Sequence, residues 1–163
     1  MEWPLLSPTC CHRPVAQVPS RTSTLAGVRT ERLGRVRARM AELGVDALLL
    51  SLGADLPWLT GYEAMPLERL TLLVLLADGD ATLVVPALEA PRVAEDRSLF
   101  SLRPWSETED PVAIVAGLVG RRSVLAVSDR TWATFVLALQ ARLSGSTWRS
   151  ASEVTWPLRA VKD

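Results

Sequence analysis

The chain has few of the residues that most often carry catalysis and metal binding. Its 163 residues include one histidine, His12, and two adjacent cysteines, Cys10 and Cys11. A Ser-His-Asp triad and a Cys-His dyad both need an imidazole beside the nucleophile, so both kinds of catalytic site are excluded from the rest of the chain. Adjacent cysteines do not build a disulfide framework. A zinc site needs about four ligands, and no second Cys or His pair completes the cluster at 10–12. We therefore expect this cluster to have no function.

An excess of charge of one sign is also missing. Lys and Arg number 18 and so do Asp and Glu, which gives a net charge of +0. The chain thus lacks the basic surface of a general nucleic-acid binder, and we expect no nucleic-acid partner. It contains neither a G-x-G-x-x-G nor a G-x-x-x-x-G-K-S/T stretch, so the two common phosphate-binding loops are excluded.

Long apolar runs are absent as well. The longest strongly apolar run, residues 70–77, is far too short to cross a bilayer, and we expect no membrane partner. The first residues lack the basic start and the continuous apolar segment of a signal peptide. Cytoplasmic residence is therefore the default expectation.

The residues that are present suit one folded domain. An apolar fraction of 48% is ordinary for a chain that buries a hydrophobic core. Residues 1–28 hold several Pro, Ser and Thr without periodicity, and we predict that they form a disordered leader. We assign residues 29–154 to the domain and residues 155–163 to the start of a linker.

Three segments have the pattern of helices. Apolar positions at helical spacing predict a helix that Thr30 caps and Gly44 ends. Asp110 and Pro111 are a good N-cap and first residue for a helix to residue 119. A third stripe places Trp132 in the core together with positions 135, 136, 139 and 143. A weaker helix is expected at 88–95.

Short apolar runs between these helices predict strands. Asp78-Gly79 is a tight-turn signal that joins two of them as an antiparallel hairpin. The expected strands are 45–51, 70–77, 81–86, 99–105, 123–127 and 146–150, with the run at 70–77 central and the last one at an edge. Alternating helices with both hairpin and crossover strands indicate an α/β domain, a mixed parallel and antiparallel sheet flanked by helices.

Two polar clusters each allow a structural and a functional interpretation. Glu107, Glu109 and Asp110 lie at a helix start, where negative charge is favoured, so capping explains them better than a metal does. Ser128 and Asp129 follow a strand and precede a helix. Capping of that helix is the first hypothesis for this pair, and orientation of a ligand at the strand end is the second.

The stretch "LSLGADLPWLTGY" at 50–62 contains the candidate site. Trp58 and Tyr62 bracket Thr60 and Gly61 in an expected loop. Gly61 permits a turn or a close backbone approach, and Trp and Tyr suit half-buried positions with one polar end satisfied. The pair either seals the edge of its own domain or contacts a partner. These four residues are our candidates for an interface or for substrate access.

Taken together, these features resemble the N-terminal domain of the creatinase/prolidase/aminopeptidase P family of Xaa-Pro peptidases. Members carry an arginine-rich first helix, here "RLGRVRARMAELGVDALLL", and a loop of the form "NIxYLTGF/Y", here "DLPWLTGY". A "VP-x-LE" step follows, here "VPALE", and the closing "PLRAVKD" is similar to the family's linker. The resemblance runs from Thr30 to Asp163. Asp55 and Trp58 stand where Asn and Tyr are usual.

The resemblance implies a creatinase N-terminal (ribonuclease H-like) fold and an accessory role. The family's catalytic half has a pita-bread fold and holds two divalent metal ions, and none of its ligand motifs occurs here. We thus expect no catalytic, cofactor-binding or metal-binding residue in this chain. Its expected partners are a missing or separately encoded catalytic domain and further copies in a homo-oligomer. The expected role is assembly and access to the active site.

Two alternatives to this role remain open. The chain can instead be a stand-alone peptide- or protein-binding module derived from the family, or an inert gene fragment. A pull-down or peptide-array screen with residues 30–163 tests the binding module, and poor solubility is what the inert fragment predicts. The resemblance alone does not assign catalytic activity to this chain.

Overall fold

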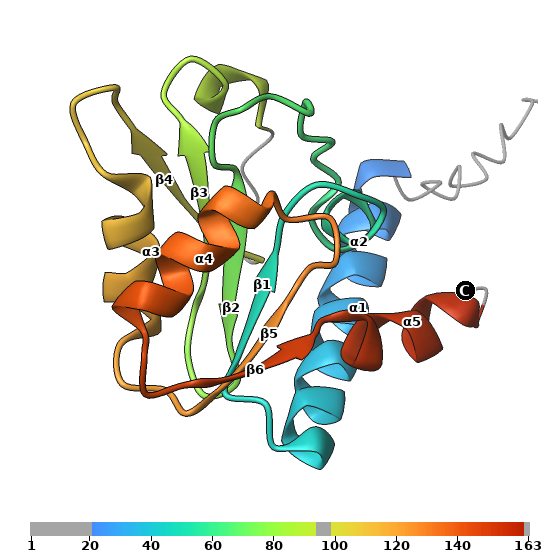
Figure 1. Ribbon diagram of the computed structural model, residues 1–163. Helices are drawn as coiled ribbons and strands as arrows, with labels where there is room; N and C mark the ends of the chain where they lie inside the picture. Colours follow the sequence, from blue (N-terminus) through green and yellow to red (C-terminus); the bar gives the residue numbers. More distant parts are fainter. Residues whose placement is uncertain (1–20, 94–98, 162–163) are drawn as a thin grey trace, which may run out of the picture.

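The computed structural model describes residues 21–93 and 99–161 (Figure 1). The helices are α1 Arg21–Leu43, α2 Asp55–Thr60, α3 Pro111–Val119, α4 Ala133–Arg142 and α5 Ser152–Ala160, with a short 3₁₀ helix at Ala90–Arg92. The strands are β1 Ala47–Leu50, β2 Leu72–Leu76, β3 Ala81–Pro86, β4 Ser101–Trp105, β5 Val124–Val127 and β6 Thr147–Ser150. The Cys10, Cys11 and His12 cluster lies outside the described residues.

The six strands form one mixed sheet in the order β4-β3-β2-β1-β5-β6. β2 runs antiparallel to both of its neighbours, and the other pairs are parallel. This confirms the predicted mixed sheet, the hairpin through Asp78-Gly79, the central place of β2 and the edge position of β6. Because five strands point the same way, β1, β5 and β6 have their carboxyl ends at the same end of the sheet.

Helices cover both faces of the sheet (Figure 1). In β1, Leu48 and Leu50 face the layer that contains α1, α2 and α5. Ala47 and Leu49 face the layer that contains α3 and α4. All four side chains are fully buried, which explains why a strand covered on both sides is a continuous apolar run in the sequence.

The first helix begins earlier than the sequence predicts. It starts at Arg21, so the predicted N-cap Thr30 lies inside it, where its hydroxyl donates to the carbonyl oxygen of Ala26 at 3.0 Å. Residues 21–28, which we assigned to the leader, are therefore helical. The predicted end is confirmed, because Gly44 follows the helix with a φ of 65°. A threonine can cap a helix or bond back to the preceding turn, and the sequence did not distinguish the two.

The start of α3 is confirmed. In the described part of the helix predicted at 88–95, only one 3₁₀ turn forms, at Ala90–Arg92. The Asp110 carboxylate accepts hydrogen bonds from the amides of Val112 and Ala113 at 2.9 and 3.0 Å. Glu109 accepts from the Ser106 amide and from Arg103. These contacts support the capping interpretation of the acidic cluster.

The core prediction for Trp132 is wrong. Trp132 is the residue before α4 and is 44% exposed. Only the later positions of the predicted stripe, Leu139 and Leu143, are buried against the sheet. The predicted stripe began at Trp132, one residue before the first residue of α4.

The segment predicted to begin the linker is helical up to Ala160. α5 spans Ser152–Ala160 and crosses the predicted boundary between residues 154 and 155. Val154 and Thr155 are buried and the helix packs beside α1. Among the described residues, no helix is long and apolar enough to span a bilayer.

Candidate functional site

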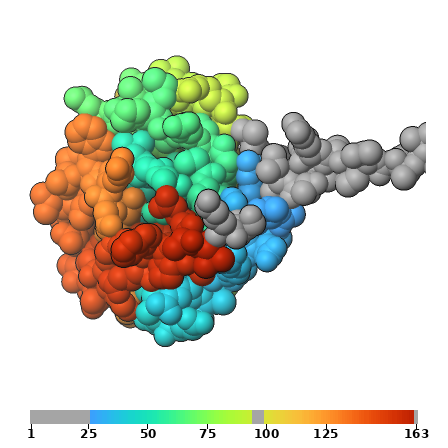
Figure 2. All heavy atoms as spheres, turned by 90° about the vertical axis from the view of Figure 1, so that its right-hand side faces the viewer, coloured from blue at the N-terminus to red at the C-terminus, as the bar shows by residue number. Residues whose placement is uncertain are grey.

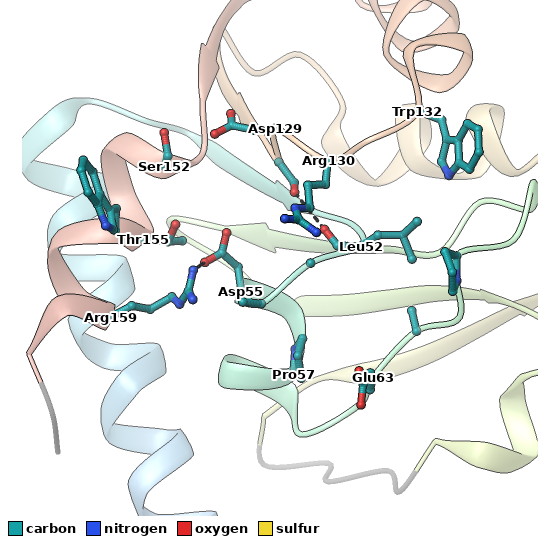
Figure 3. A pocket seen from close by; sticks show the side chains of 16 residues that line it. Leu52, Asp55, Pro57, Glu63, Asp129, Arg130, Trp132, Ser152, Thr155 and Arg159 are labelled. Atoms are coloured by element: carbon teal, nitrogen blue, oxygen red, sulfur yellow. Dashed lines mark hydrogen bonds and ion pairs between the residues drawn. The ribbon is translucent and has the colours of Figure 1, made fainter.

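A cavity of about 960 Å³ opens where β1, β5 and β6 end (Figure 3). Its walls come from the segments that follow these strands. The lining residues are Leu52, Gly53, Ala54, Asp55, Pro57, Glu63, Ala64, Pro66, Ser128, Asp129, Arg130, Trp132, Ser152, Thr155, Trp156 and Arg159. In open α/β sheets the carboxyl ends of the strands are the usual place for a ligand, and the cavity volume falls in the range of small-molecule sites.

Ser128 ties two of these segments together. Its amide donates to the carbonyl oxygen of Leu49 at 2.8 Å, which continues the β1–β5 pairing by one step. Its hydroxyl donates to the carbonyl oxygen of Leu52 at 3.4 Å, a bond drawn in Figure 3. Ser128 and Asp129 do not cap α4, because the N-cap is Trp132 and it makes no side-chain cap bond. The capping hypothesis for this pair is therefore wrong, and both residues line the cavity instead.

Five charged side chains line the cavity, and some of them form ion pairs or hydrogen bonds with other residues while others do not. Arg159 donates to the Asp55 carboxylate at 2.9 Å, and the two form an ion pair. Asp129 accepts a hydrogen bond from the Ser150 hydroxyl. Arg130 has no hydrogen bond or ion pair to another described residue, and its side chain extends into the cavity between Leu52 and Asp129 (Figure 3). One cavity guanidinium is thus neutralised and the other is available.

Gly53 makes room for the Arg130 side chain. A Cβ atom at position 53 would lie 3.0 Å from Cδ of Arg130, and the glycine has a φ of 117°. A larger residue would need an unfavourable backbone conformation and would displace the arginine. The backbone of the β1–α2 loop therefore sets the path of this guanidinium.

Two exposed indoles stand at the rim of the cavity. Trp132 precedes α4 and Trp156 lies in α5, where it is 71% exposed. Figure 2 shows the face on which α5, the segments after β1 and the start of α4 meet. Exposed apolar side chains that gather in one place mark a contact surface more often than isolated ones do. The sequence identified neither tryptophan as a site residue, although the Ser128-Asp129 signal at the strand end pointed to the right loop.

The four residues that the sequence singled out lie beside this cavity and do not line it. Trp58 and Thr60 belong to the short helix α2, where a loop was expected. The guanidinium of Arg32 stacks 5.2 Å from the Trp58 ring centre and donates to the Trp58 carbonyl oxygen at 2.8 Å. α1 therefore covers Trp58, which is half-buried.

Thr60 and Gly61 end α2. The Thr60 hydroxyl donates to the carbonyl oxygen of Leu56 at 2.7 Å and accepts from the Tyr62 amide at 3.1 Å. Gly61 adopts a φ of 77° and its amide donates to the carbonyl oxygen of Pro57. A Cβ atom on Gly61 would overlap the Arg29 guanidinium. Both predicted uses of this glycine, a turn and a close approach, are present.

Tyr62 is 6% exposed, and its side chain contacts the "VPALE" motif at residues 85–89. Its hydroxyl lies 3.5 Å from Oε2 of Glu89, the last residue of "VPALE", and Arg92 pairs with the same oxygen at 2.7 Å. Burial, the Glu89 charge and the hydrogen bond to Glu89 raise the pKa of Tyr62, while the Arg92 charge opposes them. These contacts support the interpretation that Tyr62 packs within its own domain. The interface role of Trp58, Thr60, Gly61 and Tyr62 stays a prediction.

No metal pair is accommodated by the residues that the structure describes. Among them, no group of three or more His, Cys, Asp and Glu side chains could hold a metal ion. The divalent metals that the family resemblance implies therefore do not fit this part of the chain, and we assign them no step here.

Comparisons with known proteins agree with the geometry. The Creatinase/Prolidase N-terminal domain family matches residues 32–161. The probable dipeptidase PepE of Mycobacterium tuberculosis is 34% identical over 142 residues, which cover 85% of this chain and 38% of that protein. This chain thus spans 38% of the length of that relative.

Solved structures give the same result. Dipeptidase PepE from Mycobacterium ulcerans has a TM-score of 0.76 at 34% identity, over 84% of this chain and 38% of that one. The N-terminal domain of an X-Pro dipeptidase from Streptococcus pyogenes has a TM-score of 0.64 at 21% identity, over 74% of this chain and 98% of that one. The second likeness shows the shared fold.

Proposed function

The chain belongs to the Creatinase/Prolidase N-terminal domain family, and we propose that it serves as the noncatalytic N-terminal domain of a metal-dependent Xaa-Pro aminopeptidase- or dipeptidase-like protein. In this role it contributes to oligomer assembly and to access to the active site of a catalytic domain. That domain, with its divalent metals, lies outside these 163 residues. Cytoplasmic residence is part of the same proposal.

The exposed indoles around the cavity carry this proposal. Trp132, the residue before α4, and Trp156 in α5 line the same cavity, and the nearby loop adds Met65 and Leu67, which are also exposed. Tryptophan and methionine are enriched at the centres of protein interfaces. α5 ends on the same side of the molecule (Figure 1). Any residues that follow 161 would therefore start close to these exposed side chains.

A chimera tests the assembly role. The matched 142-residue segment of the Mycobacterium tuberculosis dipeptidase relative is replaced by the corresponding part of this chain. We expect the chimera to keep the oligomeric state of the parent, measured by light scattering, and to hydrolyse Xaa-Pro dipeptides with added Mn²⁺. A folded chimera that is monomeric or inactive, beside an oligomeric and active parent, would contradict the proposal.

Variants of the chimera locate the surface. Trp132→Ala combined with Trp156→Ala is expected to weaken assembly and to lower turnover. Leu137→Ala is the matched control, because Leu137 is 65% exposed on α4 and does not line the cavity. The 163-residue chain by itself is expected not to cleave these dipeptides, and cleavage that a chelator abolishes would show a metal site in it.

A stand-alone binding module is the second candidate, and the cavity favours it. A hollow of about 960 Å³ with charged and aromatic walls is large enough for a small ligand or a peptide end. A peptide-array screen with the purified chain tests this candidate. A purely accessory domain finds no ligand in that screen.

A further inference from the structure

We propose that the cavity at the ends of β1, β5 and β6 binds a small zwitterion, a molecule with one free carboxylate and one free ammonium group. Its carboxylate pairs with Arg130, and its ammonium lies on the acidic side of the cavity. Free amino acids and short unblocked peptides share this chemistry. The inference rests on the binding-module candidate, whose ligand class it names, and it does not depend on the assembly role.

Arg130 is placed as a carboxylate receptor. It lies in a turn closed by the Thr131 amide, which donates to the Ser128 carbonyl oxygen at 3.0 Å, and its side chain crosses Gly53. No described residue pairs with its guanidinium, whereas the other cavity arginine, Arg159, is held by Asp55 at 2.9 Å. Arg130 is an exposed residue, and a free planar guanidinium can bind a carboxylate through two parallel hydrogen bonds.

The remaining charges select against a net negative ligand. The lining contains the carboxylates of Asp55, Glu63 and Asp129 and the guanidiniums of Arg130 and Arg159. The formal sum is one excess negative charge. After the Asp55–Arg159 pair is set aside, Asp129 and Glu63 face the same cavity from its two sides, with Arg130 between them (Figure 3). A dianion would be repelled, while a zwitterion places its carboxylate beside Arg130 and its ammonium beside the two carboxylates.

The aromatic rim suits the uncharged part of such a ligand. Trp132 and Trp156 line the cavity and are both exposed. An indole face accepts both an aliphatic side chain and a nearby cation. The cavity therefore combines one cationic group, two acidic groups and an apolar wall within one hollow.

Four related ligands test the proposal by amide chemical shifts in ¹⁵N–¹H spectra of the full chain. They are alanylalanine, its N-acetyl form, its C-terminal amide and the form blocked at both ends, with glycine as a fifth probe for free amino acids. We expect alanylalanine to shift the amides of residues 52–55 and 128–132. Each block should weaken binding by about tenfold, since each removes a charge-assisted hydrogen bond. Stronger binding of glycine than of alanylalanine would assign the site to free amino acids.

Charge variants decide whether Arg130 acts as proposed. Arg130→Met should weaken alanylalanine binding by about tenfold or more and make the C-terminal amide bind equally well. Arg130→Lys should retain part of the affinity. Arg121→Met is the matched control, because Arg121 is an exposed arginine ahead of β5, at the other end of the sheet, and it should leave binding unchanged. Asp129→Asn and Glu63→Gln should affect only ligands with a free ammonium.

Three results would overturn the inference. These are no shifts with either alanylalanine or glycine up to their solubility limits, equal binding of the doubly blocked form, and unchanged binding in Arg130→Met with an otherwise native spectrum. Such results would not contradict the assembly role, because the oligomeric state and activity of the chimera test that role separately. A monomeric chimera, conversely, would leave this inference intact.

Discussion

The two ends of the central sheet are built differently. The closed end consists of residues 44–46, 77–80, 120–123 and 144–146, where β1, β3, β5 and β6 begin and β2 ends. The open end consists of residues 51–70, 128–132 and 151–161, where β1, β5 and β6 end. The same sheet supports both ends, but the connections at the open end are longer and include α2 and α5.

At the closed end, side chains satisfy the backbone. The Asp46 carboxylate accepts from the amides of Ser123 and Val124, both at 2.9 Å. Arg122 donates to the Val119 carbonyl oxygen and pairs with Asp78 at 3.0 Å. The Ser146 hydroxyl donates to the carbonyl oxygen of Arg122. Polar groups here stabilise the connections between strands.

At the open end, polar and aromatic groups remain available. Arg130 lacks a charged partner among the described residues, and Trp132 and Trp156 are exposed. Of the large apolar side chains that the structure shows exposed, none belongs to the closed end. A protein keeps such groups in water where they meet a ligand or a partner. The contrast therefore supports the choice of the open end for the proposed site.

The largest expected effect compares one aspartate from each end. Asp46→Ala removes an acceptor from two backbone amides, so it should lower the free energy of unfolding by about 2–3 kcal/mol. Asp129→Ala at the open end should cost about 0.5 kcal/mol or less, because Asp129 is exposed and accepts from one hydroxyl. Urea unfolding measures both. Equal losses would show that the two ends do not differ in this way.

Asp46→Asn is the control for this pair. The asparagine keeps an acceptor oxygen at the same position, so it should recover part of the stability that alanine loses. A loss as large as that of Asp46→Ala would show that the charge, and not the acceptor, stabilises the closed end.

The second comparison uses two glycines with positive φ. Gly44 at the closed end has a φ of 65° and open space around its Cβ position, while a Cβ on Gly61 would overlap Arg29. Gly44→Ala should cost about 1 kcal/mol from backbone strain alone. Gly61→Ala should cost about 2 kcal/mol, because Arg29 must also move. Thermal and urea unfolding give both values.

Asparagine separates the two causes. Because Asn tolerates the left-handed region, Gly44→Asn should be close to wild type. Gly61→Asn should still lose stability through its contact with Arg29. The double variant Gly61→Ala, Arg29→Ala should be less destabilised than the sum of its single changes, and strict additivity would argue against the contact.

The sequence predicted the buried strands better than the open end, for a physical reason. Burial on both faces makes a strand a continuous apolar run, so β1 and β2 were recognisable from composition alone. Asp110 and Pro111 were equally clear, because an N-cap acts on its own neighbours. Thr30 was not, since its hydroxyl bonds back within a helix that begins nine residues earlier.

The cavity depends on contacts that no local pattern records. Arg130 is available because Gly53, from a distant segment, leaves room for it. Trp132 has the spacing of a core residue, yet the chain turns there before α4 begins. The resemblance marked Tyr62 and Glu89 as separate motifs, and only the fold brings their side chains within 3.5 Å of each other.

The smallest expected effect concerns Tyr62, the buried phenol of the open end. Burial and the Glu89 charge hold its pKa above the ordinary value, which is about 10. The folded state thus favours the neutral phenol. Its contribution to stability is complete below the unfolded pKa and is lost as pH rises through the raised folded pKa. Tyr62→Phe should therefore match wild type at neutral pH and lose less stability above pH ~10.

Because Tyr62 is the single tyrosine of the chain, phenolate absorbance follows this group alone. Glu89→Gln removes the negative charge beside the hydroxyl, so the titration midpoint of the folded protein should fall. Arg92→Met removes the charge that opposes it, so the midpoint should rise. A folded protein in which both variants titrate like wild type would separate Tyr62 from these neighbours. The two family-like motifs would then be joined by packing alone, and the ionic contact between them would have no measurable consequence.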